Sequence, residues 1–178
     1  MPASRQSSSA RSRSSSSQYQ PLPVSASAWR SGVLHLRLSG AEAAVGAAIA
    51  RLGGECLAKD AADVLWAGLR DQRDAFFDGD EALWRLSLPS DALAVELDGA
   101  QLVEWGGAQR WLRSSAPADR VRARVAELGG HATLFRHGDR RSEVFHPLPA
   151  PLMTLHRRLK NAFDPAGIFN PGRLYEGL

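Results

Sequence analysis

The strongest constraint on the fold is an internal repeat of sixteen residues. When the sequence is shifted by 76 positions, Ser39 aligns with Ser115, and Leu-Gly-Gly at 52–54 aligns with Leu-Gly-Gly at 128–130. Seven of the sixteen positions are identical without a gap, and one more is an Ile/Val exchange. A repeat of this kind indicates a duplicated structural unit. Each copy has the pattern of a strand, a helix and a second strand.

The first copy shows how the sequence encodes the parts of this unit. Leucines alternate with polar residues from 34 to 38, which predicts a half-buried strand. Ser39 and Glu42 have the spacing of a helix-capping box, and the following helix carries an apolar stripe and ends at Gly53. The stripe is Val45, Ile49 and Leu52 here, and Val121, Val125 and Leu128 in the second copy. Two such units predict an α+β, ferredoxin-like duplicated βαβ sandwich, with an antiparallel sheet and helices on one face.

Further elements are expected between the copies and after them. Residues 63–77 have the apolar spacing of a helix, and alternating segments at 84–88, 93–97 and 102–105 predict a β-meander. A closing amphipathic helix is predicted over 151–163, with Leu152, Leu155, Leu159 and Phe163 on one stripe.

Length and charge limit the function classes. The chain has 178 residues, enough for one domain with a real core, and no apolar run approaches the roughly 20 residues of a membrane span. Three of the 22 basic residues lie in the acid-free residues 1–20, so the remainder is neutral and lacks the basic face that nucleic-acid binding needs. The five tryptophans are therefore better explained by core or interface packing than by base stacking. Cys56 is alone, which excludes an internal disulfide and suits a reducing cytosol.

Residues 1–20 are rich in Ser and Arg and contain too few apolar groups to fold, so we expect a disordered tail before a single domain at 21–178. A targeting peptide shares this composition, although the segment lacks the apolar residues of an amphipathic helix. As a further alternative, residues 1–20 come from an artefactual start of a truncated reading frame.

The C-terminal residues 163–175 form a Pro- and Gly-punctuated tail after the closing helix. Pro165 and Pro171 each fix φ, while Gly167 and Gly172 supply backbone freedom, so Ile168 and Phe169 can be anchored between two turns. With residues 155–162 upstream, this tail resembles the C-terminus of the FAD-linked oxidases of vanillyl-alcohol-oxidase type, and most closely the glycolate oxidase-type members. In that family the segment leaves the cap domain and returns to the flavin domain.

The resemblance implies a cap, or substrate-side, domain of a flavin-dependent 2-hydroxyacid oxidase. It implies FAD as cofactor, partner subunits that include an iron–sulfur protein, and a cytoplasmic location, at the inner membrane through those partners. Asn170 and Arg173 match family positions that approach the flavin domain. Without the family resemblance, a turn-capping Asn and an Arg in a surface ion pair would be the favoured explanation. No Gly-rich phosphate loop is present, so we expect the N-terminal FAD-binding domain to be absent and the chain alone to bind FAD weakly.

The densest polar cluster is a candidate for substrate contact. A 2-hydroxy acid needs an Arg for its carboxylate and a His for its hydroxyl proton, and Arg136, His137 and His146 supply these types. The alternative is an ordinary hairpin turn at 137–141 between residues 134–135 and 144–145. The cluster is superficially similar to the metal-binding motif of related 2-hydroxyacid dehydrogenases, but the Asn and second His of that motif are missing, so no metal is predicted. A cofactor-free assembly subunit of a larger oxidoreductase is the alternative function.

Overall fold

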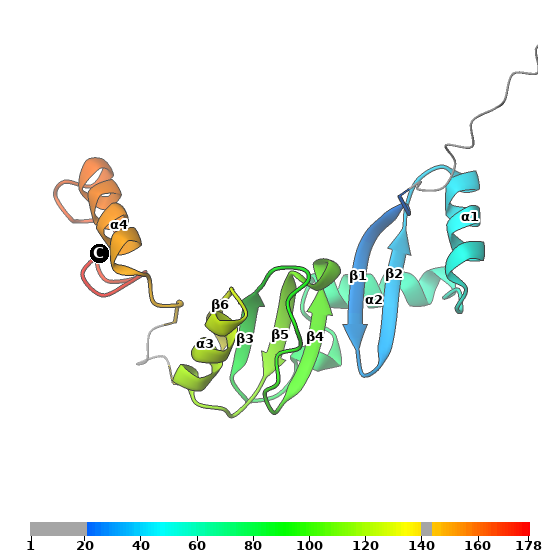
Figure 1. Ribbon diagram of the computed structural model, residues 1–178, viewed down its shortest axis with the longest axis horizontal. Coiled ribbons are helices and arrows are strands. Elements are labelled where there is room, and N and C mark those ends of the chain that lie inside the picture. Colours follow the sequence, from blue (N-terminus) through cyan, green and yellow to red (C-terminus); the bar gives the residue numbers. More distant parts are fainter. Residues whose placement is uncertain (1–20, 140–143) are drawn as a thin grey trace, which may run out of the picture.

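The computed structural model describes residues 21–139 and 144–178, so the predicted tail at 1–20 lies outside the described residues. Within them the chain forms one six-stranded sheet with four α-helices and two short 3-10 helices (Figure 1). The strands are β1 (Val24–Arg30), β2 (Val33–Leu38), β3 (Leu83–Ser87), β4 (Ala100–Glu104), β5 (Gln109–Arg113) and β6 (His131–Arg136). The helices are α1 (Glu42–Leu52), α2 (Lys59–Arg70), η1 (Ala75–Phe77), η2 (Trp105–Gly107), α3 (Ala118–Glu127) and α4 (Ala150–Phe163).

The sheet has the strand order β2-β1-β4-β5-β3-β6, and every neighbouring pair is antiparallel. The predicted α+β class with an antiparallel sheet is therefore confirmed. The second copy of the repeat forms the expected unit, because β5 leads through α3 to β6 while β3 lies between these two strands.

The structure does not show the predicted ferredoxin-like duplication, because the first copy continues differently. The helix ends at Gly53 as expected, with φ of 66° and its N–H bonded to the Ile49 carbonyl, but the chain then enters α2 instead of a strand. Between Gly54 and α2 only Leu57 is a large apolar residue, too little for a buried strand. The predicted capping box is also wrong. The N-cap of α1 is Ala41, and the Ser39 hydroxyl instead lies 2.8 Å from that of Ser25.

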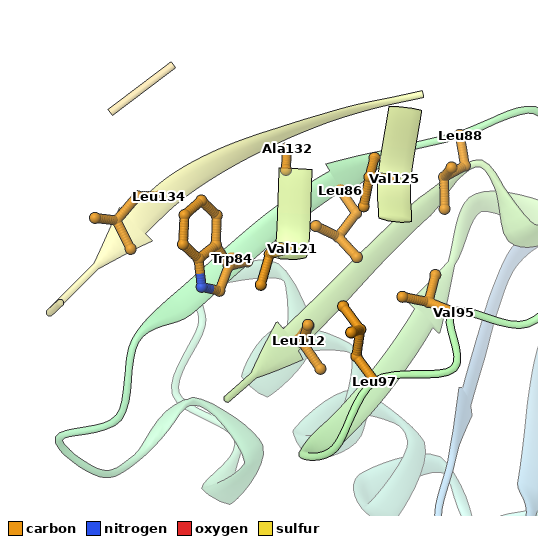
Figure 2. Close-up of a cluster of buried hydrophobic side chains, with 10 residues drawn as sticks. All are labelled: Trp84, Leu86, Leu88, Val95, Leu97, Leu112, Val121, Val125, Ala132 and Leu134. Atoms are coloured by element: carbon orange, nitrogen blue, oxygen red, sulfur yellow. The ribbon is translucent and has the colours of Figure 1, made fainter. Parts of the chain in front are cut away.

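One face of the sheet carries the larger core cluster, in which α3 and residues 88–97 pack on the strands (Figure 2). Trp84 and Leu86 of β3 meet Val121 and Val125 of α3 in this cluster. Its other buried members are Leu88, Val95, Leu97, Leu112, Ala132 and Leu134. The apolar stripe predicted for the second helix is thus the one that faces the sheet.

The opposite face carries a second core cluster, which α2 and η1 cover. Its buried members are Ala28, Leu69, Phe76, Phe77, Leu83, Leu102 and Trp111. The prediction that helices lie on one face only is therefore wrong. The physical reason is that β5 places large apolar side chains on both faces, since Leu112 points into the first cluster and Trp111 into the second.

The predicted strand at 93–97 is instead an irregular segment packed over the first core cluster. Val95 and Leu97 are buried there, but side chains, not a neighbouring strand, bond the backbone carbonyls of this region. The Arg110 guanidinium donates to the carbonyls of Ala92 and Leu93 at 2.6 and 2.7 Å, and to that of Gly107 at 3.1 Å. Burial lowers the pKa of Arg110, and its three carbonyl partners take the place of a counter-ion.

The closing helix α4 begins one residue before the predicted start and ends at the predicted Phe163. Figure 1 shows it standing away from the sheet, joined to β6 by a linker. The predicted apolar stripe faces outward, because Leu152, Leu155, Leu159 and Phe163 are all exposed. No helix in the described part of the chain combines the length and apolarity needed to cross a membrane.

The irregular segment over the core gives a first test. Arg110→Met keeps much of the side-chain length but removes three charged donors, so we expect a loss of about 2–4 kcal/mol in the free energy of unfolding by urea. Arg120→Met, at an exposed position of α3, is the matched control and should change this value by less than about 0.5 kcal/mol. Equal effects of the two variants would show that Arg110 does not hold the segment.

Candidate functional site

The tail after α4 is held by the carboxylate of Asp164, which is buried although almost all of its neighbours are exposed. One carboxylate oxygen accepts the N–H of Ile168 at 3.1 Å, and the other accepts the N–H of Phe169 at 2.9 Å. The Asp164 carbonyl accepts the N–H of Gly167 at 3.0 Å. The predicted anchoring of Ile168 and Phe169 therefore acts through their backbone, while their side chains point outward and are exposed.

Lys160, one helical turn before Asp164, completes this anchor. Its ammonium donates to the Asp164 carboxylate at 2.6 Å and to the Phe169 carbonyl. The hydrogen bond from Lys160, more than those from the backbone of Phe169 and Ile168, holds the pKa of Asp164 below its ordinary value. The tail thus folds back along α4 because one acid and one base of the helix satisfy its polar groups.

Tyr175 fastens the end of the tail to the linker between β6 and α4. It is one of the few buried residues of this region, and its hydroxyl donates to the His146 carbonyl at 3.2 Å. Its ring lies 6.0 Å from that of Phe145 and 6.2 Å from that of His156, measured between centroids. Helix, linker and tail therefore form one unit, here called the C-terminal module (residues 144–178).

A hollow of about 480 Å³ opens on the C-terminal module. Asn170 and Arg173, the predicted cofactor-contacting residues, both line it together with Leu159 and Phe163 of α4. Asn170 adopts a left-handed φ of 47°, which Asn tolerates, and its carbonyl accepts the N–H of Arg173 at 3.2 Å. Phe163 is 84% exposed and Ile168 is 69% exposed. The structure thus places an amide and a guanidinium at the edge of an uncovered apolar surface.

A second hollow, of about 710 Å³, lies on the sheet face that α2 only partly covers. Three indole rings line it, from Trp66, Trp105 and Trp111, together with Glu104 and Gln109. Trp105 is 66% exposed and has a left-handed φ of 52°, which is rare for a bulky residue. Of the five tryptophans, Trp84 and Trp111 are core residues as predicted, whereas Trp105 and Trp29 are exposed.

The predicted substrate cluster is not gathered at one point. The Arg136 guanidinium donates to the Gln72 side chain at 2.7 Å and lies over the ring of Phe135, whereas His137 is exposed in a turn, with φ of 57°. Nδ1 of His146 accepts the N–H of Ala132 at 3.3 Å, near the other end of β6. Arg140 and Arg141 of the same cluster lie outside the described residues.

His146 belongs to the edge of the sheet more than to a polar pocket. Burial first, and then the nearby charges of His131 and Arg122, lower its pKa and favour the neutral imidazole that accepts the Ala132 N–H. Val144 acts in the same way, since its carbonyl accepts the N–H of Leu134 at 2.8 Å. Together these bonds satisfy part of the outer edge of β6.

Within residues 21–139 and 144–178, no group of three His, Cys, Asp or Glu side chains is placed to hold a metal ion.

Comparison with known proteins gives the family. Residues 106–174 match the family model of the FAD linked oxidases, C-terminal domain. Over 161 residues the chain is 46% identical to glycolate oxidase subunit GlcE of Escherichia coli (strain K12). That alignment covers 90% of this chain and 44% of the relative. No solved structure shows significant similarity to the chain.

The chain therefore belongs to the FAD-linked oxidases, and residues 106–174 carry their C-terminal domain. Within that family it is a homologue of glycolate oxidase subunit GlcE, of whose length it spans less than half. The matched region contains β5, α3, β6 and most of the C-terminal module, so the family resemblance inferred from the tail is confirmed.

The anchor of the tail can be removed by one substitution. Asp164→Ala deletes the acceptor of two tail N–H groups and of Lys160, so limited proteolysis between residues 165 and 174 should accelerate by about tenfold or more. Glu176→Ala removes an exposed acid of the same tail and should leave the cleavage rate unchanged. Cleavage of the Asp164→Ala protein at the unmodified rate would contradict the anchoring role.

Acid should release the tail by the same route. Because the folded-state pKa of Asp164 lies below its ordinary value of 3.8, the anchor is fully present above that value and is lost as the pH falls through the lowered folded value. The amide NMR signals of Ile168 and Phe169 should therefore titrate with a midpoint below 3.8. A midpoint at or above 3.8, or no titration of these two amides, would contradict the assigned hydrogen bonds.

Proposed function

We propose that residues 21–178 form the cap domain of a flavin-dependent 2-hydroxyacid oxidoreductase of the glycolate oxidase type. The homology to a glycolate oxidase subunit supports the reaction class. The single structural observation that carries the proposal is the C-terminal module, which presents an anchored tail, two polar side chains and an exposed apolar stripe. A surface built in this way is suited to packing against another folded part.

The partner of the C-terminal module in this proposal is the flavin-binding part of the enzyme. The chain matches 44% of GlcE, so the relative has a further portion large enough to be a separate domain. Leu155, Leu159 and Phe163 would be covered by that portion, and Asn170 and Arg173 at the edge of the hollow would approach the cofactor that it carries. Burial of such a stripe is favourable, at about 25 cal/mol for each Å² of apolar surface.

The described residues fit one edge of FAD but not the whole molecule. The amide of Asn170 offers a donor and an acceptor, and the guanidinium of Arg173 offers several donors, to a flavin or its phosphates. The sequence contains no Gly-rich phosphate loop, so the pyrophosphate must be held elsewhere. When bound, FAD supplies the acceptor for the hydride of the substrate. The role of this chain is to orient the substrate and to exclude water above that acceptor.

The proposal includes partner subunits, among them an iron–sulfur protein that takes the electrons onward. The exposed tryptophans Trp29 and Trp105 are candidates for such an interface, since aromatic residues are enriched in interface cores.

The alternative function is that of a cofactor-free subunit that only stabilises a larger complex. The missing phosphate loop favours this alternative for the chain by itself, and flavin retention separates the two functions.

A chimera tests the proposal. Residues 21–178 replace the aligned part of E. coli GlcE, which is expressed with the other glycolate oxidase subunits, and flavin content and glycolate-dependent dye reduction are measured. We expect both to be present, whereas the unfused chain should be colourless. Replacing Asn170 and Arg173 by Ala removes two polar contacts and should raise the Kd for FAD in the chimera by about tenfold to a hundredfold.

Arg158→Ala, at an exposed position of α4 outside the hollow, serves as the matched control and should leave flavin content unchanged. A folded chimera without flavin would reject the proposed cap function. Full flavin content in the double variant would show that Asn170 and Arg173 do not contact FAD and that the tail has a structural role only.

A further inference from the structure

Arg85 lies on β3, next to the edge strand β6, on the sheet face that carries the Trp-lined hollow. Its strand β3 is flanked by β5 and β6, and the register places Arg85 directly opposite Trp111 on one side and Thr133 on the other. Directly opposed residues of antiparallel strands project from the same face. The side chain of Arg85 is nevertheless exposed, whereas Leu83 and Trp111 on this face are buried in the second core cluster. Arg85 thus lies where the helical cover of α2 and η1 ends.

A chain of hydrogen bonds fixes the direction of this side chain. Nε of Arg85 donates to Oε1 of Gln109 at 2.9 Å, and Nε2 of Gln109 donates to Oε2 of Glu104 at 3.1 Å. The same oxygen of Glu104 accepts the indole N–H of Trp111 at 2.6 Å. Since Gln109 is buried and its amide is held at both ends, the guanidinium of Arg85 is oriented before any ligand arrives.

The charge of Arg85 has no counter-ion among the residues that the structure describes. Arg85 takes part in none of the ion pairs between described residues. The Glu104 carboxylate, which is linked to Arg85 through Gln109, accepts hydrogen bonds from Gln109 and Trp111 instead. Its bonded Nε leaves the two terminal nitrogens for other acceptors. An exposed, oriented guanidinium with free terminal donors matches the planar geometry of a carboxylate.

The neighbours of Arg85 complete a small site. Trp111 of β5 and Phe135 of β6 stack edge to face at 5.0 Å between centroids and form an apolar wall beside Arg85. Thr133, two residues before Phe135 on β6, offers a hydroxyl. Cation, hydroxyl and apolar wall are the groups that a short acid with one polar substituent needs.

We propose that Arg85 binds the carboxylate of the substrate, positioned by Gln109 and Glu104, and thereby selects a small 2-hydroxy acid. This inference rests on the proposed function for the identity of the substrate, but the anion site itself is a property of the chain. It assigns substrate binding to the open sheet face and not to the turn that contains His137.

Anion binding can be measured without any flavin. In the full chain labelled with nitrogen-15, oxalate and glycolate are titrated while the side-chain signals of Arg85, Gln109 and Trp111 are followed by NMR. We expect saturable shifts of all three signals, lost in Arg85→Lys and retained in the control Arg120→Lys, which lies on α3 at the opposite face. Signals that do not move, or that move equally in Arg85→Lys, would overturn the proposal.

Kinetics of the chimera separate this inference from the proposed function. If the chimera oxidises glycolate, Arg85→Lys should raise KM by about tenfold to a hundredfold with a smaller change in kcat, because a bidentate carboxylate contact is lost. Gln109→Ala should raise KM less, because it removes the hydrogen bond that orients the guanidinium of Arg85 but keeps the guanidinium itself. An unchanged KM in an active Arg85→Lys chimera would overturn the role of Arg85 and leave the cap function standing. An inactive chimera whose chain still shows the NMR shifts would overturn the cap function and leave the anion site at Arg85 standing.

Discussion

The structure depends on the two-sided burial of β5. Leu112 and Trp111 follow each other on this strand and are almost completely buried, one on each face of the sheet. Both faces therefore need cover, since about 25 cal/mol is gained for each Å² of apolar surface removed from water. One face receives α3 and residues 88–97, and the other receives α2 and η1. The second cover is incomplete, and the hollow of Trp66, Trp105 and Trp111 opens where it ends.

This incomplete cover has a functional consequence. A strand residue beyond the helices, such as Arg85, stays exposed while its hydrogen-bond partner Gln109 is buried, which is how a rigid scaffold presents an oriented polar group. The C-terminal module exposes apolar groups instead of a polar one. Its backbone is fixed by Asp164 and Tyr175, but its apolar side chains remain uncovered, so its shape is set before any partner arrives. In the proposed function, the two surfaces serve the two tasks of a cap, substrate contact and attachment to a cofactor-bearing part.

Local patterns predicted local structure well. The helix ends at Gly53 and before Gly129, and the closing helix up to Phe163, follow from periodicity and glycine position alone. The alternation at 93–97 correctly indicated burial of Val95 and Leu97 but not their backbone partners, because Arg110 is distant in sequence and takes the place of a strand. The repeat was misleading after Gly54, where the two copies differ in apolar content. The network of Arg85, Gln109 and Glu104 was beyond prediction, since it depends on strand register and on where α2 stops covering the sheet.

We propose that the C-terminal module is an attachment surface for a flavin-bearing part. Hydrogen–deuterium exchange of backbone amides in residues 150–174 measures this attachment, when the chain alone is compared with the same chain inside a GlcE chimera. We expect exchange to slow in the chimera across the outer half of α4 and the tail, while β3 and β5 exchange equally in both. Unchanged exchange across 150–174 in a folded, flavin-containing chimera would contradict it.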